Sequence, residues 1–368
     1  VMLDGVFNHT GFVSRYFNGD GFYPELGAHQ SQDSPYYSWY NFYQWPDQYE
    51  SWWGIYSLPS MNEHDPAYRE FIFGGEDSVV RRWLRAGADG WRLDVADELP
   101  DDFGEVWEDG STKVAYGVRR KHILGRHCDG LMNYPFRGAA LDYLRGGDAA
   151  DFMETMETLR ENYPPFAYYS AMNSLGTHDT PRILTLLGVG SECRERSREW
   201  RASFRMEADQ RRRGKELLKL GAALLLAFPG SPTVYYGDEA GMEGFEDPFN
   251  RRTFPWGRED YELLGWFTRL GHLRQECPAL RRGDIRYRAA QGALLAFTRS
   301  AEGETILAAF NTGGESAELR LEDAERIELL LGSARFQISA QGHVLTLPPR
   351  TGSLLKLSVS GDALQEPD

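Results

Sequence analysis

Two acidic residues, each in a strand-like run, lie only eleven positions apart in this 368-residue sequence. Asp94 ends the run GWRLD, and Glu105 begins the core of the run GEVWED. Cutting a glycosidic bond needs two carboxyl groups facing each other across the bond, one as nucleophile or base and one as acid. A cation keeps the nucleophile ionised, and Arg92 would share a strand face with Asp94 because residues i and i+2 point the same way. The spacing therefore predicts a carboxylate pair suited to glycoside chemistry.

Further acids and histidines follow other strand-like runs. VMLDGVFNH contains Asp4 and His9, and NSLGTHD ends with His178 and Asp179. Taken singly, each acid could cap a following helix, and each histidine could be a packed residue. Acids at the ends of four strands, flanked by histidine and arginine, favour a common site instead.

The elements that must position these residues alternate along the chain. We expect strands within 1–9, 90–98, 104–109, 129–135, 171–179 and 233–239, and helices at 65–86, 137–160, 181–188 and 196–228. Such alternation indicates βαβ units and a parallel sheet. In a (β/α)₈ barrel the polar strand ends form the active-site face. An open doubly wound sheet would also place ligands there, but the chain has no GxGxxG or GxxxxGK phosphate loop.

Two regions break this rhythm. Residues 10–62 are rich in aromatic residues, glycine and proline without a helical period, and a long loop of this kind is usually functional. From 284 onward, short alternating runs such as TILAAFNT and HVLTLPP predict antiparallel strands. We therefore expect a catalytic domain at 1–283, with an inserted domain at about 10–62, and a C-terminal β-sandwich at 284–368.

The amino-acid composition argues against several classes of binding partner. The formal net charge of −15 argues against nucleic acid, and no apolar run reaches the roughly 18 residues of a membrane span. Three scattered cysteines without CxxC spacing argue against disulfides and thiolate metal sites. Unpaired cysteines favour a cytoplasmic location.

Several motifs occur in the order found in one family. VMLDGVFNHT, GWRLDVADE, GEVWED and NSLGTHD resemble the four conserved segments of the α-amylase family, glycoside hydrolase family 13. LPSMN resembles the family's fifth segment in its neopullulanase and cyclomaltodextrinase branch, and VYYGDEAGMEG with DPFNRRTFPWG resembles the eighth strand and its loop. The resemblance covers most of residues 1–280.

This resemblance implies a fold, an activity and residue roles. It implies a (β/α)₈ TIM barrel and a retaining hydrolase of α-1,4 glucosidic bonds, with α-1,6 bonds as a further target, in maltooligosaccharides, pullulan or cyclodextrins. Asp94 would be the nucleophile, Glu105 the general acid/base with a raised pKa, and Asp179 a stabiliser of the transition state. The other sugar-binding positions would be Asp4, His9, Arg92, His178, Asp247 and Arg251. An α-glucosidase or oligo-1,6-glucosidase is the close alternative, although those enzymes more often carry QPDLN where this chain has LPSMN.

The chain departs from the family pattern in three places. Asn8 matches a calcium ligand of the family, but Glu98 replaces the histidine that completes that site, so we predict no required cofactor or metal. The first motif belongs to the family's third strand, so strands one and two are expected to be absent. The short Asp94–Glu105 connection leaves no room for a crossover helix. A catalytically inactive fragment or a binding protein of the same fold therefore stays an alternative, and a homodimer is open.

Overall fold

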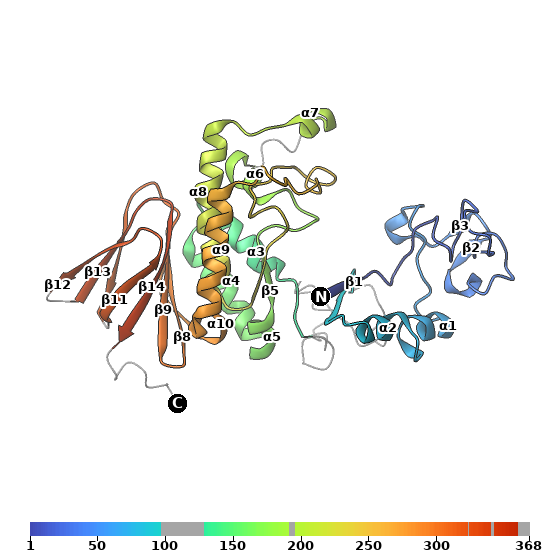
Figure 1. Cartoon of the computed structure of the whole chain (residues 1–368), viewed down its shortest axis with the longest axis horizontal. Helices are drawn as coiled ribbons and strands as arrows, with labels where there is room; N and C mark the ends of the chain where they lie inside the picture. Colours follow the sequence, from blue (N-terminus) through green and yellow to red (C-terminus); the bar gives the residue numbers. More distant parts are fainter. Residues whose placement is uncertain (97–128, 191–195, 323, 340–341, 360–368) are drawn as a thin grey trace. The chain divides into compact units, whose positions relative to one another are not determined.

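A computed structural model describes residues 1–96, 129–190, 196–322, 324–339 and 342–359, and these form two compact units, Val1–Asp129 and Gly130–Asp368 (Figure 1). Among the helices of these residues, none has both the length and the apolar run needed to cross a membrane. The predicted strand at 104–109 lies outside the described residues.

The first unit contains one parallel strand pair and several short elements. Strand β1 (Met2–Gly5) pairs with β4 (Gly90–Leu93), and the register sets Asp4 opposite Arg92. The remaining elements of this unit are η1 (Tyr37–Trp39), the antiparallel pair β2 (Phe42–Gln44) and β3 (Gln48–Tyr49), η2 (Trp52–Gly54), α1 (Pro66–Arg69), η3 (Glu70–Gly74) and α2 (Val79–Arg85).

Aromatic packing organises residues 10–62. The Phe17 side chain is fully buried, and its ring contacts the rings of Tyr40 at 4.9 Å and Tyr49 at 4.8 Å between centroids. Edge-on contacts of this kind stabilise an aromatic cluster beyond the area that it buries. The long segment therefore has its own small core, although it contains little regular secondary structure.

The second unit is built on helices around two short parallel strands. Its strands β5 (Met172–Ser174) and β6 (Ser231–Thr233) are paired in parallel. Its helices are α3 (Tyr134–Leu144), α4 (Ala149–Asn162), α5 (Pro165–Ser170), α6 (Ile183–Val189), α7 (Arg198–Ser203), α8 (Ala208–Ala227), α9 (Tyr261–Glu276) and α10 (Pro278–Arg282). Helix α8 carries a capping box in which Glu207 and Gln210 satisfy backbone N–H groups at its start.

Several predicted elements differ from those observed. The helix expected at 65–86 is divided into α1, η3 and α2, and of the strand expected at 233–239 only Thr233 belongs to β6. The helix expected at 137–160 is broken into α3 and α4, because Gly146 adopts a left-handed φ of 105° and Asp148 caps a new helix start. The helix expected at 196–228 is likewise divided into α7 and α8. The strand expected at 129–135 is reduced to a single parallel bridge between Met132 and Met172.

The C-terminal region forms two antiparallel sheets, as its alternating sequence predicts. A five-stranded sheet has the order β11–β14–β9–β8–β7, and a three-stranded sheet has the order β10–β13–β12. Their bounds are β7 (Asp284–Gln291), β8 (Leu294–Ala301), β9 (Glu304–Asn311), β10 (Ala317–Leu321), β11 (Ala324–Leu331), β12 (Arg335–Ser339), β13 (Gly342–Leu347) and β14 (Thr351–Val359). Buried side chains from both sheets form one cluster that includes Leu307, Leu321 and Leu345.

The larger sheet also packs against the helices of the second unit, beside α8 and α9 (Figure 1). Phe297 and Phe310 of this sheet share a core with residues of α8. Arg299 is fully buried and donates to the carbonyl oxygens of Ala227, at the end of α8, and Gly283. A cation at a helix C-terminus satisfies carbonyl groups that have no partner within the helix.

Candidate active site

Arg92 links the two acids predicted around it in the first unit. Its Nη1 donates to Asp94 Oδ1 at 2.5 Å and to Asp4 Oδ1 at 3.0 Å. The contact follows from the strand pairing, because Asp4 lies opposite Arg92 and Asp94 lies two residues further along. Burial tends to lower the pKa of Arg92, but the hydrogen bonds and charges of the two carboxylates outweigh it and raise that pKa. The arrangement holds a cation against Asp94.

The backbone turns sharply directly after Asp94. Val95 has a φ of 47°, a left-handed conformation that is strained for a β-branched residue. Such strain persists where the surrounding structure or a function requires it. The Asp94 N–H meanwhile donates to the Gly5 carbonyl at 3.0 Å. Both features hold the backbone of Asp94 in position at the end of the strand.

His9 lies in the same unit as this cluster. Its ring stacks on Trp52 with centroids 4.9 Å apart, and its backbone forms an antiparallel bridge with Ser60. Glu105, the predicted partner of Asp94, and Glu98 both lie outside the described residues.

Asn8 does not by itself provide a calcium site. Its side chain is 3% exposed, and its amide atoms have no hydrogen-bond partner within the part of the chain that the structure describes. Calcium takes six to eight oxygen ligands. No group of three or more histidine, cysteine or acidic side chains suited to a metal occurs among the described residues.

In the second unit, the predicted residues His178 and Asp179 lie on a turn that another loop holds. His178 Nε2 is 3.1 Å from Asp179 Oδ2, and Arg251 Nη2 is 3.5 Å from Asp179 Oδ1. Arg251 Nε also donates to the His178 carbonyl at 3.2 Å and lies 3.5 Å from Asp247 Oδ1. The structure thus brings these four predicted residues together.

Asn250 also holds the turn that carries His178 and Asp179, and it was not predicted from the sequence. It is fully buried, and its Nδ2 donates to the carbonyl oxygens of His178 at 2.6 Å and Thr180 at 2.9 Å. Its position beside Arg251 was the only sequence signal, since a single asparagine in a loop does not reveal carbonyl partners seventy positions away. The two hydrogen bonds fix the backbone that carries His178 and Asp179.

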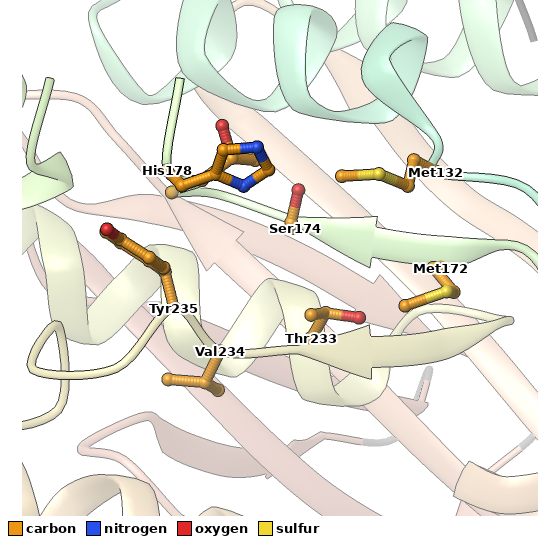
Figure 2. A pocket seen from close by; sticks show the side chains of 9 residues that line it. Met132, Met172, Ser174, His178, Thr233, Val234 and Tyr235 are labelled. Atoms are coloured by element: carbon orange, nitrogen blue, oxygen red, sulfur yellow. The ribbon is translucent and has the colours of Figure 1, made fainter. Parts of the chain in front are cut away.

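A pocket of about 120 Å³ opens beside this turn. Figure 2 shows His178 and Tyr235 toward one end of it, Met132 and Met172 toward the other, and Ser174 between them. Because β5 and β6 are parallel, their C-terminal ends meet at the same edge of the sheet, where the pocket lies. Its wall is mostly apolar with a few polar groups, and its volume is smaller than the roughly 300–1,000 Å³ of a typical ligand site.

A buried ion pair lies behind the pocket wall, and it was not predicted from the sequence. Arg182 Nη1 is 3.1 Å from Asp238 Oδ1 and also donates to the Tyr236 carbonyl, and both side chains are almost fully buried. The Arg182 guanidinium lies over the ring of Tyr235 at 4.2 Å. Burial raises the pKa of Asp238 to about 7, although the neighbouring Arg182 opposes the rise. The pair fixes the tyrosine that lines the pocket.

Two protein families match parts of this sequence. The Alpha amylase, catalytic domain family matches residues 101–272, and the Maltogenic Amylase, C-terminal domain family matches residues 288–352. The amylopullulanase of Thermoanaerobacterium saccharolyticum is 32% identical over 100% of this chain and 32% of its own length. The cyclomaltodextrinase of Geobacillus thermopakistaniensis is 30% identical over 95% of this chain and 58% of its own length.

Solved structures agree with these matches. The native form of the Nostoc punctiforme debranching enzyme has a TM-score of 0.76 and 28% identity, covering 96% of this chain and 75% of that one. The chain spans less than two thirds of the length of both curated relatives.

Proposed function

The chain belongs to the α-amylase family, and from this premise we propose that it cleaves glucosidic bonds with retention of configuration. The substrates would be α-1,4-linked glucans, with α-1,6 bonds as a second target, in maltooligosaccharides, pullulan or cyclodextrins. One observation carries the proposal: Arg92 holds Asp94 and Asp4 together at the C-terminal end of paired parallel strands. Relatives named amylopullulanase, cyclomaltodextrinase and neopullulanase support the substrate class.

In the proposed mechanism, Asp94 is the nucleophile. Its carboxylate attacks the anomeric carbon while Glu105 donates a proton to the leaving oxygen, and the glycosidic bond breaks. Water, deprotonated by Glu105, then attacks the glycosyl–Asp94 ester and releases the sugar. Arg92 donates a hydrogen bond to the Asp94 carboxylate and orients it. A sugar hydroxyl can replace the water, which gives transglycosylation.

Four residues of the second unit, by their match to the family's motifs, are proposed to bind sugar. Asp179 would accept hydrogen bonds from sugar hydroxyls, and His178 would bind the same sugar. Arg251 supports this role because it contacts Asp179 directly and the His178 backbone carbonyl. Asp247 and Arg251 would contact the sugar on the non-reducing side.

We further propose the finer assignment of the fold. Strand β1 would be the family's third barrel strand, residues 10–62 the domain inserted after it, and the boundary near 283 the junction with the β-sandwich. The alignment with the amylopullulanase runs over 425 positions, more than this chain's 368 residues. This difference supports a shortened connection relative to that enzyme, and we place it between Asp94 and Glu105.

The remaining proposals concern partners and location. We propose that the reaction needs no cofactor and that Asn8 has a structural role rather than a calcium-binding one. The net charge of −15 supports an uncharged glucan as partner rather than nucleic acid. A cytoplasmic location is proposed from the cysteines, of which Cys277 is free and buried.

Release of reducing ends from maltooligosaccharides, pullulan and cyclodextrin tests the proposal. The chain should release reducing sugar, and Asp94→Asn should lose at least about 10³-fold in rate, because catalytic groups that act as a unit have effects of this size or larger. Activity that survives Asp94→Asn would refute the assignment of the nucleophile. A folded protein without activity on any of the three glucans would instead indicate a non-catalytic member of the fold.

A further inference from the structure

In the second unit, the segment before α8 packs against the loop at 243–252. Helix α7 (Arg198–Ser203) and the residue after it, Phe204, lie at the end of a segment that runs out from the start of α8, and we call them the α7 strap (Figure 1). The Phe204 ring meets the buried ring of Phe245 edge-on at 5.1 Å between centroids, and Trp200 lies 4.8 Å from Phe204 and 5.7 Å from Phe245. Because ring contacts of this kind add to the area that they bury, the aromatic cluster fastens the strap to the loop.

Polar contacts join the same two segments. Arg201 Nη1 of the strap lies 3.5 Å from Glu246 Oε2 of the loop. In the opposite direction, Arg252 Nη2 of the loop donates to the Ala202 carbonyl of the strap at 2.7 Å. Each segment therefore supplies a guanidinium that binds an oxygen of the other.

These contacts lie on both sides of Asp247 and Arg251, the two residues of the loop that are proposed to bind sugar. Glu246 directly precedes Asp247, and Arg252 directly follows Arg251. Asn250 attaches the loop to the turn on its other side through two hydrogen bonds. The loop is thus held from one side by Asn250 and from the other by the α7 strap.

Asp247 and Arg251 are held only weakly by each other. Their side chains are 57% and 45% exposed, and Arg251 Nε lies 3.5 Å from Asp247 Oδ1. An exposed ion pair of this kind fixes its side chains little. The backbone hydrogen bonds of this stretch are local, from the Phe249 N–H to the Glu246 carbonyl and from the Arg251 N–H to the Pro248 carbonyl. Contacts from outside the loop must therefore set where the two side chains lie.

We infer that the α7 strap positions Asp247 and Arg251 for the glucose unit on the non-reducing side of the attacked one. Phe204 and Arg201 are positioning residues, because they act on that sugar through the loop. This inference rests on the proposed glucan-cleaving function and adds to it a determinant of affinity for longer glucans. A loosened strap should weaken the binding of glucans that reach this position and leave the chemistry at the attacked glucose unchanged.

Steady-state kinetics with two substrates test the inference in the full-length chain. Maltohexaose extends to the non-reducing side of the cleaved bond, whereas α-glucosyl fluoride supplies only the glucose that is attacked. Phe204→Ala should raise KM for maltohexaose about 3- to 10-fold with kcat within about twofold, because an interaction made equally in the ground and transition states changes KM alone. For α-glucosyl fluoride, kcat/KM should stay within about twofold of the wild type. Phe204→Tyr, which keeps the ring, should restore the KM for maltohexaose.

Arg201→Gln is a second and milder variant. It removes the ion pair with Glu246 and should raise KM for maltohexaose about 2- to 4-fold, as expected for a partly exposed pair. If thermal unfolding shows that Phe204→Ala is not folded at the assay temperature, Arg201→Gln decides the test. Arg212→Gln is the matched control, because Arg212 lies on α8 in an exposed ion pair with Asp209, and its kinetics on both substrates should equal those of the wild type.

The outcomes separate this inference from the proposed function. An unchanged KM for maltohexaose in the folded strap variants would overturn the inference and leave the proposed function standing. Equal losses of kcat/KM on both substrates would also overturn it, because they would assign the strap to the general stability of the site. A wild-type chain that cleaves neither substrate would overturn the proposed function itself.

Discussion

Replacing Arg182 with methionine should destabilise the protein in a way that depends on pH. The substitution removes the guanidinium that lies 3.1 Å from buried Asp238 and over the ring of Tyr235. Methionine fills a similar volume without charge. Removing one partner of a buried ion pair typically costs about 3–5 kcal/mol, because the other charge is left without compensation.

The pH dependence follows from the Asp238 carboxyl. Its pKa is raised to about 7 from an ordinary 3.8, so the folded state binds the proton more tightly than the unfolded state. Folding stability from this group therefore falls as pH rises from about 4 to 7. Besides Arg182, the nearby charges are Glu239, which raises the pKa, and Arg137, which lowers it. Without Arg182 the pKa rises further, so the cost of the substitution should be largest above pH 7.

Thermal and urea unfolding of the wild type and Arg182→Met at pH 8 and pH 5.5 measure this effect. At pH 8 we expect the loss of about 3–5 kcal/mol, or about 6–20 °C in Tm for a unit of this size. At pH 5.5 Asp238 is mostly neutral, so the loss should be clearly smaller, and what remains should reflect the lost hydrogen bond to the Tyr236 carbonyl and the lost contact with the Tyr235 ring. Arg350→Met is the control, because its ion pair with Glu216 at 3.3 Å is exposed and should be worth less than about 1 kcal/mol at both pH values. An equal loss for Arg182→Met at both pH values would show that the Asp238 charge does not determine the cost of removing Arg182.

Two further substitutions probe the two clusters of predicted residues, one in each unit. Asn250→Ala removes hydrogen bonds to the carbonyl oxygens of His178 and Thr180. It should lower the free energy of unfolding in urea by about 2–3 kcal/mol and lower kcat/KM at least about tenfold. An unchanged kcat/KM would show that the turn with His178 and Asp179 does not need these hydrogen bonds. Arg92→Lys keeps the charge but not the guanidinium geometry beside Asp94, so kcat should fall about 10- to 100-fold with Tm within a few degrees of the wild type. A wild-type kcat for Arg92→Lys, measured by reducing-sugar release, would contradict the role given to that hydrogen bond.

Short-range geometry alone predicted one part of the site, and the family resemblance supplied the residues that lie far apart in the sequence. Arg92 and Asp94 are two residues apart on a strand, and that spacing alone placed them on one face. The Arg182–Asp238 pair joins residues 56 positions apart and needs the fold to bring them together. Asn250 reaches carbonyl groups 72 and 70 positions away for the same reason. Periodicity could not reveal either contact.

Fold prediction was limited in the same way. The alternation of apolar and polar residues after residue 284 identified the antiparallel strands, because side chains of a strand are buried at every second position. The break between α3 and α4 was missed because Gly146 and Asp148 interrupt a helical pattern that otherwise continues on both sides. The strained φ of Val95 has no sequence signal, since valine normally avoids that conformation.

Identification of the nucleophile is the most direct test of the account. The protein is incubated with a fluorinated glucosyl fluoride, whose good leaving group speeds formation of the glycosyl-enzyme while the ring fluorine slows its hydrolysis. Peptide mass spectrometry then locates the added sugar. We predict one fluoroglucosyl group per chain, esterified to Asp94 and absent from Asp94→Asn. A sugar on another residue, or catalytic turnover of glucans without any adduct, would contradict it.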